Sequence, residues 1–217
     1  MRKENPLFVI GISGLAGAGK STLASALMEE SWVFTRSSPG MGHATFFRES
    51  FADPIRSFVR HTFQFDPERM TDLKNEIDPF WGFSPRKAMQ MLGTEWGRAL
   101  HPDTWTRYLA HRVRQRVQDS PDRKYVVVVD DVRFPNEISA LSSLSPNLLL
   151  VRLSQEGLGR VNQHASEDLP SLPDDQIRSM LQPSQHIWSH ENKPGDQSQL
   201  HERAMYLLCT YVRPWLS

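Results

Sequence analysis

The chain has 217 residues with 25 basic and 25 acidic side chains, so its formal net charge is zero. This length corresponds to one domain, or to one domain with an inserted subdomain, and it suffices to bury a core without disulfides. Because the charges balance, no strong electrostatic field attracts the protein to polymeric nucleic acid or to a membrane surface. No apolar run is long enough to span a bilayer. We therefore expect neither polymeric nucleic acid nor a membrane as a partner.

Three features of the sequence bear on location and ligands. Cys209 is the sole cysteine and cannot form an internal disulfide, which fits a reducing cytoplasm. The opening MRKENPLFVIGISG has a short apolar stretch that runs into glycines, and we interpret it as a strand, not a signal peptide. Of the 25 basic residues, 19 are Arg and 6 are Lys. Genomic base composition explains this bias, and so does phosphate binding, for which the planar guanidinium is suited.

The N-terminal elements alternate between strand and helix. Leu7–Ile12 is a β-branched apolar run ended by glycine, which predicts a buried strand. Lys20–Glu30 places leucines on one side and predicts a helix. Ala44–Phe47 is the candidate second strand.

Three helices are predicted next. The first two begin at Asp53-Pro54 and Ser84-Pro85, each a polar cap followed by proline. His101-Pro102-Asp103 breaks the chain and starts the third, which runs to about Gln118. Between the first two, Gln64–Phe83 is predicted to be irregular.

Two patterns within these helices have alternative explanations. Gly93 and Gly97 are four residues apart, and each costs about 1 kcal/mol relative to alanine in a helix interior. Either another helix or a ligand must approach the backbone there. The arginines of the third helix are interpreted as a solvated face; they are Arg107, Arg112, Arg114 and Arg116.

The C-terminal half continues the alternation. Tyr125–Val129 is almost pure valine, as is typical of a parallel strand covered on both faces. Two further strands are predicted at Leu148–Leu153 and His186–Ser189. Helices are predicted from Pro135, at Asp174–Leu181 and at Asp196–Val212. We therefore predict an α/β fold: a three-layer sandwich with about five parallel strands and helices on both faces.

The segment between the first strand and helix carries the clearest chemical signal. Gly14-x4-Gly19-Lys20-Ser21 matches the phosphate-loop pattern, in which glycines turn backbone N–H groups into one concavity at a helix N-terminus. Lys20 would neutralise phosphate charge and the Ser21 hydroxyl would coordinate Mg²⁺. The pattern predicts ATP and Mg²⁺ as ligands, with the loop contacts made by Gly14, Ala16, Gly17, Ala18, Gly19, Lys20, Ser21 and Thr22.

A second chemical signal, an acidic one, follows the valine strand. Asp130 and Asp131 stand at its end, where an aspartate can hold Mg²⁺, and we prefer Asp130 for the metal. Arg133 follows at the same edge and is a candidate for stabilising the transferring phosphoryl group. The alternative is a local ion pair within Asp131–Arg133.

The chain resembles bacteriophage-type deoxynucleoside monophosphate kinases from about residue 7 to 167. The resemblance is carried by GISGLAGAGKST, FADPIR, MQMLGTEWGRALHPDTW, VVVVDDVRFPNE and HASE, in this order. It implies a phosphate-loop kinase fold over residues 1–217 and transfer of a phosphoryl group from ATP to a dNMP. It also implies an acceptor-binding helical region at about 53–118 and a mobile lid at about 154–173.

The same resemblance implies roles for individual residues. Lys20, Asp130, Arg133 and Arg160 would act in catalysis, the last from the lid. His164 is either a hydrogen-bonding lid residue or simply a loop histidine. Residues implied to contact the acceptor are Asp53, Arg56, Arg98, Asp131, Arg133, Glu137, His164 and Glu167. Asn192 and Gly195 correspond to an adenine-side turn, although ENKPGDQ is longer than the usual form.

Other functions remain open at this stage. The acceptor is a dNMP on the resemblance, but a phosphate loop also serves kinases of dephospho-coenzyme A or of nucleosides, and ATP-dependent switches. The implied partners are small nucleotides, in the cytoplasm of a host cell if the protein is phage-encoded. The oligomeric state is open, with a homodimer as one option. Base preference is not predicted, because it depends on a few pocket hydrogen bonds.

Overall fold

A computed structural model describes residues 5–36, 44–157, 169, 172–193 and 199–217. The chain divides into two compact units, which are described separately. The first contains Met1–Glu49 and Ala110–Ser217, and the second contains Ser50–Leu109.

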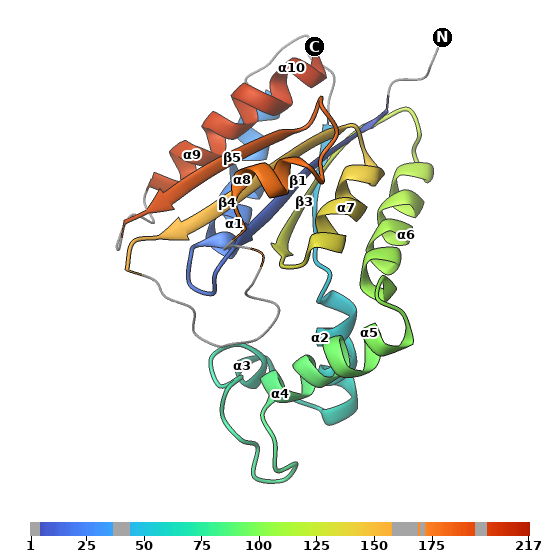
Figure 1. The fold of residues 1–217 in the computed structure, drawn as a ribbon, viewed down its shortest axis with the longest axis vertical. Helices are drawn as coiled ribbons and strands as arrows, with labels where there is room; N and C mark the ends of the chain where they lie inside the picture. Colours follow the sequence, from blue (N-terminus) through green and yellow to red (C-terminus); the bar gives the residue numbers. More distant parts are fainter. Residues whose placement is uncertain (1–4, 37–43, 158–168, 170–171, 194–198) are drawn as a thin grey trace. The chain divides into compact units, whose positions relative to one another are not determined.

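The first unit is built on a five-stranded sheet in the order β2-β3-β1-β4-β5 (Figure 1). All four neighbouring pairs are parallel. The strands are β1 (Leu7–Gly14), β2 (Ala44–Glu49), β3 (Lys124–Val132), β4 (Asn147–Gln155) and β5 (His186–Asn192). The predicted α/β fold with five parallel strands is confirmed, and each strand extends beyond its predicted end because pairing continues into polar residues.

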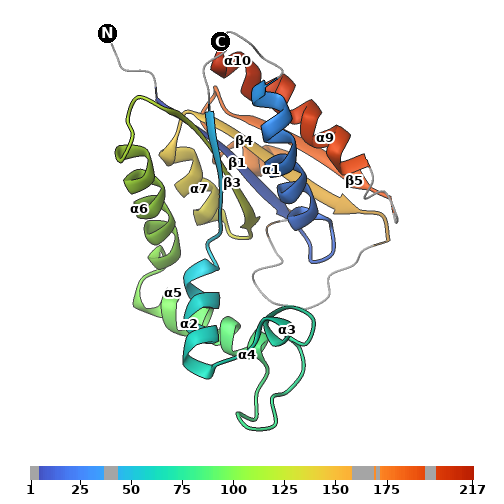
Figure 2. The same cartoon turned by 180° about the vertical axis from the view of Figure 1, so that it is seen from behind.

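Helices cover both faces of this sheet, which gives the three layers (Figures 1 and 2). On one face, α1 (Lys20–Arg36) and α9 (Leu200–Leu207) pack over Ile10, Ile12 and Val128. On the other face, α7 (Pro135–Leu144) brings Leu141 against Gly11 of β1. The predicted closing helix is divided into α9, a π-helical turn at Leu208–Val212, and α10 (Arg213–Leu216). The short helix α8 spans Asp174–Arg178.

The pairing of β1 with β3 contains an irregularity at the two aspartates. Gly11 pairs with Val129 but Ser13 pairs with Val132, so two β3 residues lie opposite one β1 residue. Asp130 and Asp131 are both buried at this bulge. β-Bulges are common beside active sites because they re-aim side chains.

The second unit is helical. Its elements are α2 (Asp53–Phe63), α3 (Pro67–Thr71), α4 (Pro85–Gln90), the π-helical segment η1 (Met91–Trp96) and α5 (Gly97–Leu100), with the start of α6 (Thr104–Gln118). Ser84 caps α4 as predicted, since its hydroxyl accepts from the Lys87 N–H at 3.2 Å. Asp53 is not a cap but the first helical residue, and Ala52 occupies the cap position.

Sequence patterns missed α3 inside the stretch predicted to be irregular. Asp66 caps it by accepting from the Arg69 N–H at 2.8 Å, and Pro67 follows at the first helical position. This is the same cap-plus-proline pattern as at Ser84, but only five residues long.

Gly93 and Gly97 are explained by packing within the second unit. A Cβ on Gly97 would lie 2.2 Å from the Trp105 ring, and one on Gly93 would lie 3.0 Å from Ile55. The Trp105 indole N–H also donates to the Gly93 carbonyl at 2.7 Å. Of the two sequence-based explanations, close packing of another helix is therefore the one observed.

Among the described residues, no helix combines the length and apolarity that crossing a bilayer requires.

Candidate active site

The phosphate loop lies at the carboxyl end of β1, and its glycines adopt conformations that other residues avoid. Gly14, Gly17 and Gly19 have φ values of 156°, 89° and 88°. A Cβ on Gly14 would lie 2.3 Å from the Leu153 carbonyl oxygen of β4. Glycine is required here both for conformation and for the close approach of β4.

The loop leads directly into α1, whose first residues carry the polar groups. The Lys20 ammonium donates to the Gly14 and Leu15 carbonyls at 2.7 and 2.6 Å, which places its charge over the loop. Ser21 and Thr22 are exposed in the first turn. A helix N-terminus with exposed hydroxyls and a lysine is suited to a polyphosphate.

Asn192 at the end of β5 supports the loop from the other side. Its side-chain amide donates to the Ala18 carbonyl at 2.8 Å, and its oxygen accepts from Arg203 of α9 at 2.6 Å. Asn192 is buried. The resemblance associated Asn192 with an adenine-side turn; here its described contacts hold the phosphate loop, and Gly195 lies outside the described residues.

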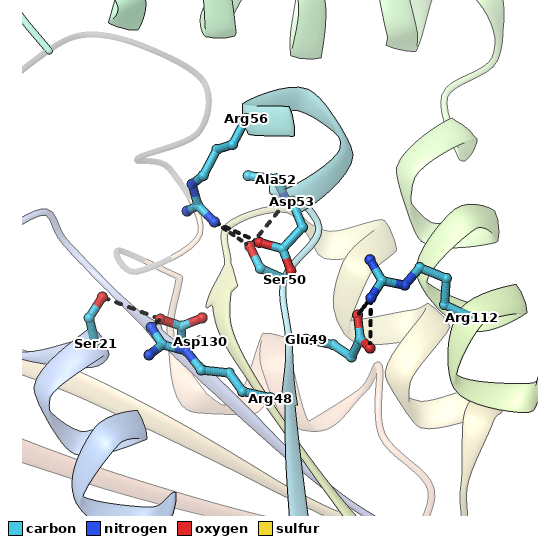
Figure 3. Close-up of polar contacts among 9 residues, drawn as sticks. All are labelled: Ser21, Arg48, Glu49, Ser50, Ala52, Asp53, Arg56, Arg112 and Asp130. Atoms are coloured by element: carbon cyan, nitrogen blue, oxygen red, sulfur yellow. Dashed lines mark hydrogen bonds and ion pairs between the residues drawn. The ribbon is translucent and has the colours of Figure 1, made fainter. Parts of the chain in front are cut away.

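Asp130 is the acidic residue that reaches the phosphate loop. One carboxylate oxygen of Asp130, Oδ2, accepts from the Ser21 hydroxyl at 3.2 Å (Figure 3). Alternation along β3 explains this, because Val126 and Val128 face α1, and Asp130 continues that face. Asp130 also forms an ion pair with Arg48 of β2, on the same oxygen.

Sequence reasoning missed Arg48. The available signal was again alternation: Phe46 packs toward α1, where it contacts Phe34, so Arg48 two residues later lies on the same face. The neighbouring strand order that brings β2 beside β3 was not predicted, so the pairing of Arg48 with Asp130 could not be inferred from the sequence.

This arrangement fits a magnesium ion. Mg²⁺ is commonly held by one or two carboxylates together with substrate phosphates, and in phosphate-loop proteins by the loop hydroxyl and a strand-end aspartate. Ser21 and Asp130 supply this donor pair within hydrogen-bonding distance of each other.

The adjacent residue of β2 makes a second ion pair on the opposite face. Glu49 is buried, and its carboxylate accepts from Arg112 at 3.1 Å and lies 3.8 Å from Arg116. The Arg116 guanidinium also stacks over Phe47 at 4.5 Å. Arg112 and Arg116 are 40% and 52% exposed, as predicted for a solvated face, and in addition they supply the cationic partners that the buried Glu49 needs.

The segment after β3 is organised by Glu137. Its carboxylate accepts from the backbone N–H groups of Arg133 and Phe134 at 2.7 and 3.1 Å and so caps α7. Glu137 is buried, whereas Arg133 is exposed at the start of the helix. Asp131 is buried at the bulge. Their roles toward an acceptor stay predictions.

The second unit carries the remaining described candidates. Arg56 is exposed and donates to Ser50 at 3.1 Å and to Asp53 at 3.0 Å. The Arg98 guanidinium donates to the Pro102 carbonyl at 3.4 Å. Arg56 and Arg98 are thus surface guanidiniums of this helical unit, and their predicted contact with an acceptor phosphate is untested.

A cavity of about 350 Å³ opens beside Gly14 in the first unit. Its polar lining includes Ser13, Arg152, Ser154, Asp174 and Glu191. Arg152 forms an ion pair with Asp174 and donates to the Leu172 carbonyl at 2.6 Å; burial lowers the pKa of its guanidinium from the usual value. The predicted lid begins at this cavity, but Arg160, His164 and Glu167 lie outside the described residues.

Comparison with known proteins adds one sequence relative. No family model matches the chain. The chain is 47% identical over 55 residues, 25% of its length, to the deoxynucleoside-5'-monophosphate kinase of Escherichia phage T5. The matched segment spans 20% of the phage protein, so the chain covers about a fifth of the relative it matches. Part of this chain is therefore similar to part of a phage kinase.

A solved structure was also compared. An unliganded sugar kinase from Janibacter sp. HTCC2649 aligns over 94% of this chain and 95% of its own, with a TM-score of 0.42 and 16% identity.

Proposed function

We propose that this protein is a kinase that transfers the γ-phosphoryl group of ATP to a deoxynucleoside monophosphate, giving a dNDP and ADP. The observation that carries the proposal is the Ser21–Asp130 contact at a complete phosphate loop, on the carboxyl edge of a parallel sheet. Ligands of such sheets bind at this edge.

The chemistry asked of the protein is positioning and charge neutralisation. Phosphoryl transfer needs little covalent help, because the barrier lies mainly in bringing two anions into line. Loop N–H groups and the start of α1 would hold the ATP phosphates, and Lys20 would turn from the Gly14 and Leu15 carbonyls toward them. Mg²⁺ held by Ser21 and Asp130 would neutralise charge on the phosphate oxygens.

The acceptor is the finer part of the proposal. It is supported by the similarity of a quarter of the chain to a deoxynucleoside monophosphate kinase. It is also supported by the resemblance of LGTEWGR and DVRFPNE, which contain Arg98 and Arg133, to that family. A second anion needs its own cations, and an arginine at a transferring phosphoryl group contributes about 10³–10⁵ in rate. We propose that Arg98 and Arg133 contact the acceptor phosphate.

The test is an ADP-release assay with and without acceptor. The panel contains the four dNMPs, modified pyrimidine dNMPs, the corresponding ribonucleotides, dephospho-coenzyme A and nucleosides. We expect turnover to depend on a dNMP. Turnover with only another acceptor would replace the proposed substrate, and acceptor-independent ATP hydrolysis would indicate a switch.

Variants separate the two substrates in the same assay. We expect Arg98→Ala and Arg133→Ala to raise the KM for the dNMP more than that for ATP. Arg123→Ala, which changes an exposed arginine before β3, is the matched control and should leave both KM values unchanged. Equal effects on both substrates, or no effect, would contradict the acceptor role.

A further inference from the structure

Arg48 is a charged residue of the site to which neither the sequence motifs nor the resemblance gives a role. We propose that Arg48 and Mg²⁺ occupy the Asp130 carboxylate alternately, and that the guanidinium released by the ion binds phosphate oxygens of the nucleotide. This inference rests on the ATP site of the proposed function, and it is independent of the acceptor.

One oxygen of Asp130 serves two groups. Asp130 Oδ2 accepts from the Ser21 hydroxyl at 3.2 Å, and the same atom is paired with Arg48 (Figure 3). An ion held between Ser21 and Asp130 would need this oxygen, because it is the one facing the loop. Mg²⁺ requires near-ideal octahedral geometry, and a guanidinium on the same atom would face it as a like charge. The two cations therefore exclude each other.

The two partners of this ion pair differ in their freedom to move. The Asp130 side chain is 7% exposed and fixed at the bulge of β3, whereas the Arg48 side chain is 39% exposed. A long, partly exposed side chain can change rotamer while the buried carboxylate stays in place. Displacement by the ion therefore moves Arg48 and leaves Asp130 in position.

The nucleotide phosphates are the nearest destination for the displaced guanidinium. Arg48 and Ser21 both approach Asp130, so the guanidinium lies next to the first turn of α1, where the loop would hold phosphates. Phosphate oxygens match the planar donors of a guanidinium, and an ion pair with them replaces the one lost at Asp130. The nucleotide thus brings both the ion that displaces Arg48 and the anion that receives it.

The neighbouring ion pair of β2 provides a contrast and a control. Glu49 is 3% exposed and is held by Arg112 and Arg116, on the strand face turned away from Asp130. Because Glu49 and Arg48 are adjacent in β2, their side chains lie on opposite faces of the strand. Arg112→Gln therefore removes a cation from the same strand end, on the face turned away from Asp130.

The experiment measures ATP binding by calorimetry, without any acceptor, in Mg²⁺ and in EDTA. The readout is the pair of ATP dissociation constants, one without and one with Mg²⁺. In Arg48→Gln, which keeps a hydrogen-bond donor but loses the charge, Asp130 repels metal-free ATP. We expect the metal-free dissociation constant to rise by about tenfold, within the usual range of coupling between sites. The Mg·ATP dissociation constant should rise as well, because the guanidinium that the ion releases is missing. Arg48→Lys should return both constants toward the wild-type values, and Arg112→Gln should leave both unchanged.

Three results would overturn the inference. An unchanged metal-free dissociation constant in a cooperatively melting Arg48→Gln protein, or in Arg48→Met if the glutamine variant fails to fold, would show that Arg48 does not exchange with the ion. Tighter binding of Mg·ATP to Arg48→Gln than to wild type would exclude the phosphate contact. Absence of ATP binding by the wild-type protein would remove the proposed function as well, whereas normal ATP binding by wild type with unchanged constants in the Arg48 variant removes only this inference.

Discussion

Two pairs of glycines in this protein meet opposite demands. Gly14 and Gly19 have positive φ values and shape an open loop whose backbone is available to a ligand. Gly93 lies in the π-helical segment η1 and Gly97 begins α5, and Ile55 and the Trp105 ring lie where their side chains would be. Glycine spacing alone does not distinguish a binding loop from a packing surface; the sign of φ does, since neither Gly93 nor Gly97 has a positive φ.

The largest effect is expected at the loop. Lys20→Ala should lower kcat by about 10²–10³-fold or more, because it removes a cation from the transferring phosphoryl group, while the melting temperature stays near that of wild type. Steady-state kinetics and thermal unfolding measure both. Arg36→Ala, at the other end of α1, is the control and should keep full activity. Near-normal turnover of Lys20→Ala would contradict the assignment of this loop to ATP binding.

Gly97→Ala should lower the stability of the protein and leave ligand binding unchanged. A methyl group would meet the Trp105 ring at 2.2 Å, and overpacking of this kind costs about 1–3 kcal/mol of unfolding free energy. Denaturant unfolding measures the loss, and ATP binding by the surviving protein should be unchanged. Gly93→Ala is the milder counterpart, because its nearest neighbour is the flexible end of Ile55. Equal stability of the Gly97→Ala variant and wild type would contradict the packing role.

Asn192→Ala tests whether the loop is supported from outside. It removes the donor to the Ala18 carbonyl and the acceptor of Arg203, and an unsatisfied buried group costs about 1–2 kcal/mol. We expect weaker ATP binding together with lower stability, measured by calorimetry and by thermal unfolding. Unaltered ATP affinity would mean that the loop holds its shape without β5.

The smallest effect on activity is expected from Trp105→Phe. The phenyl ring fills only part of the space over Gly97, because Cζ2 and Nε1, two of the three atoms nearest to a Cβ on Gly97, belong to the indole. The hydrogen bond to the Gly93 carbonyl is also lost, which by itself costs about 1 kcal/mol. Denaturant unfolding should resolve this loss, and activity should be retained. Stability equal to that of wild type would contradict the role of the indole in holding the segment.

Much of the fold could be predicted from the sequence because it depends on local periodicity. The valine run of β3 and the Ser84-Pro85 start of α4 are signals within one element. For α2 the proline marked the first turn correctly, although Asp53 does not cap it. The phosphate loop could be found in the same way, since its glycines, lysine and serine are contiguous.

Contacts between elements could not be predicted in this way. Arg48 with Asp130, Glu49 with Arg112, and Trp105 with Gly97 join residues whose proximity depends on strand order or helix packing. The sequence alone does not distinguish an arginine of a strand that pairs with a buried carboxylate from an arginine of an exposed helix. Only the burial of their carboxylate partners, Asp130 and Glu49, distinguishes them from solvated charges.

The bulge in β3 also acts as a spacer. Because Asp130 and Asp131 together lie opposite a single β1 residue, deleting one of them would restore regular pairing with β1. Strict alternation would place Val132, three residues after Val129, on the opposite face, but the bulge returns it to the face of Gly11, whose added Cβ would lie 3.4 Å from the Val132 side chain. The acidic doublet therefore lengthens β3 by one residue while the chain that leads to Arg133 keeps its phase with β1.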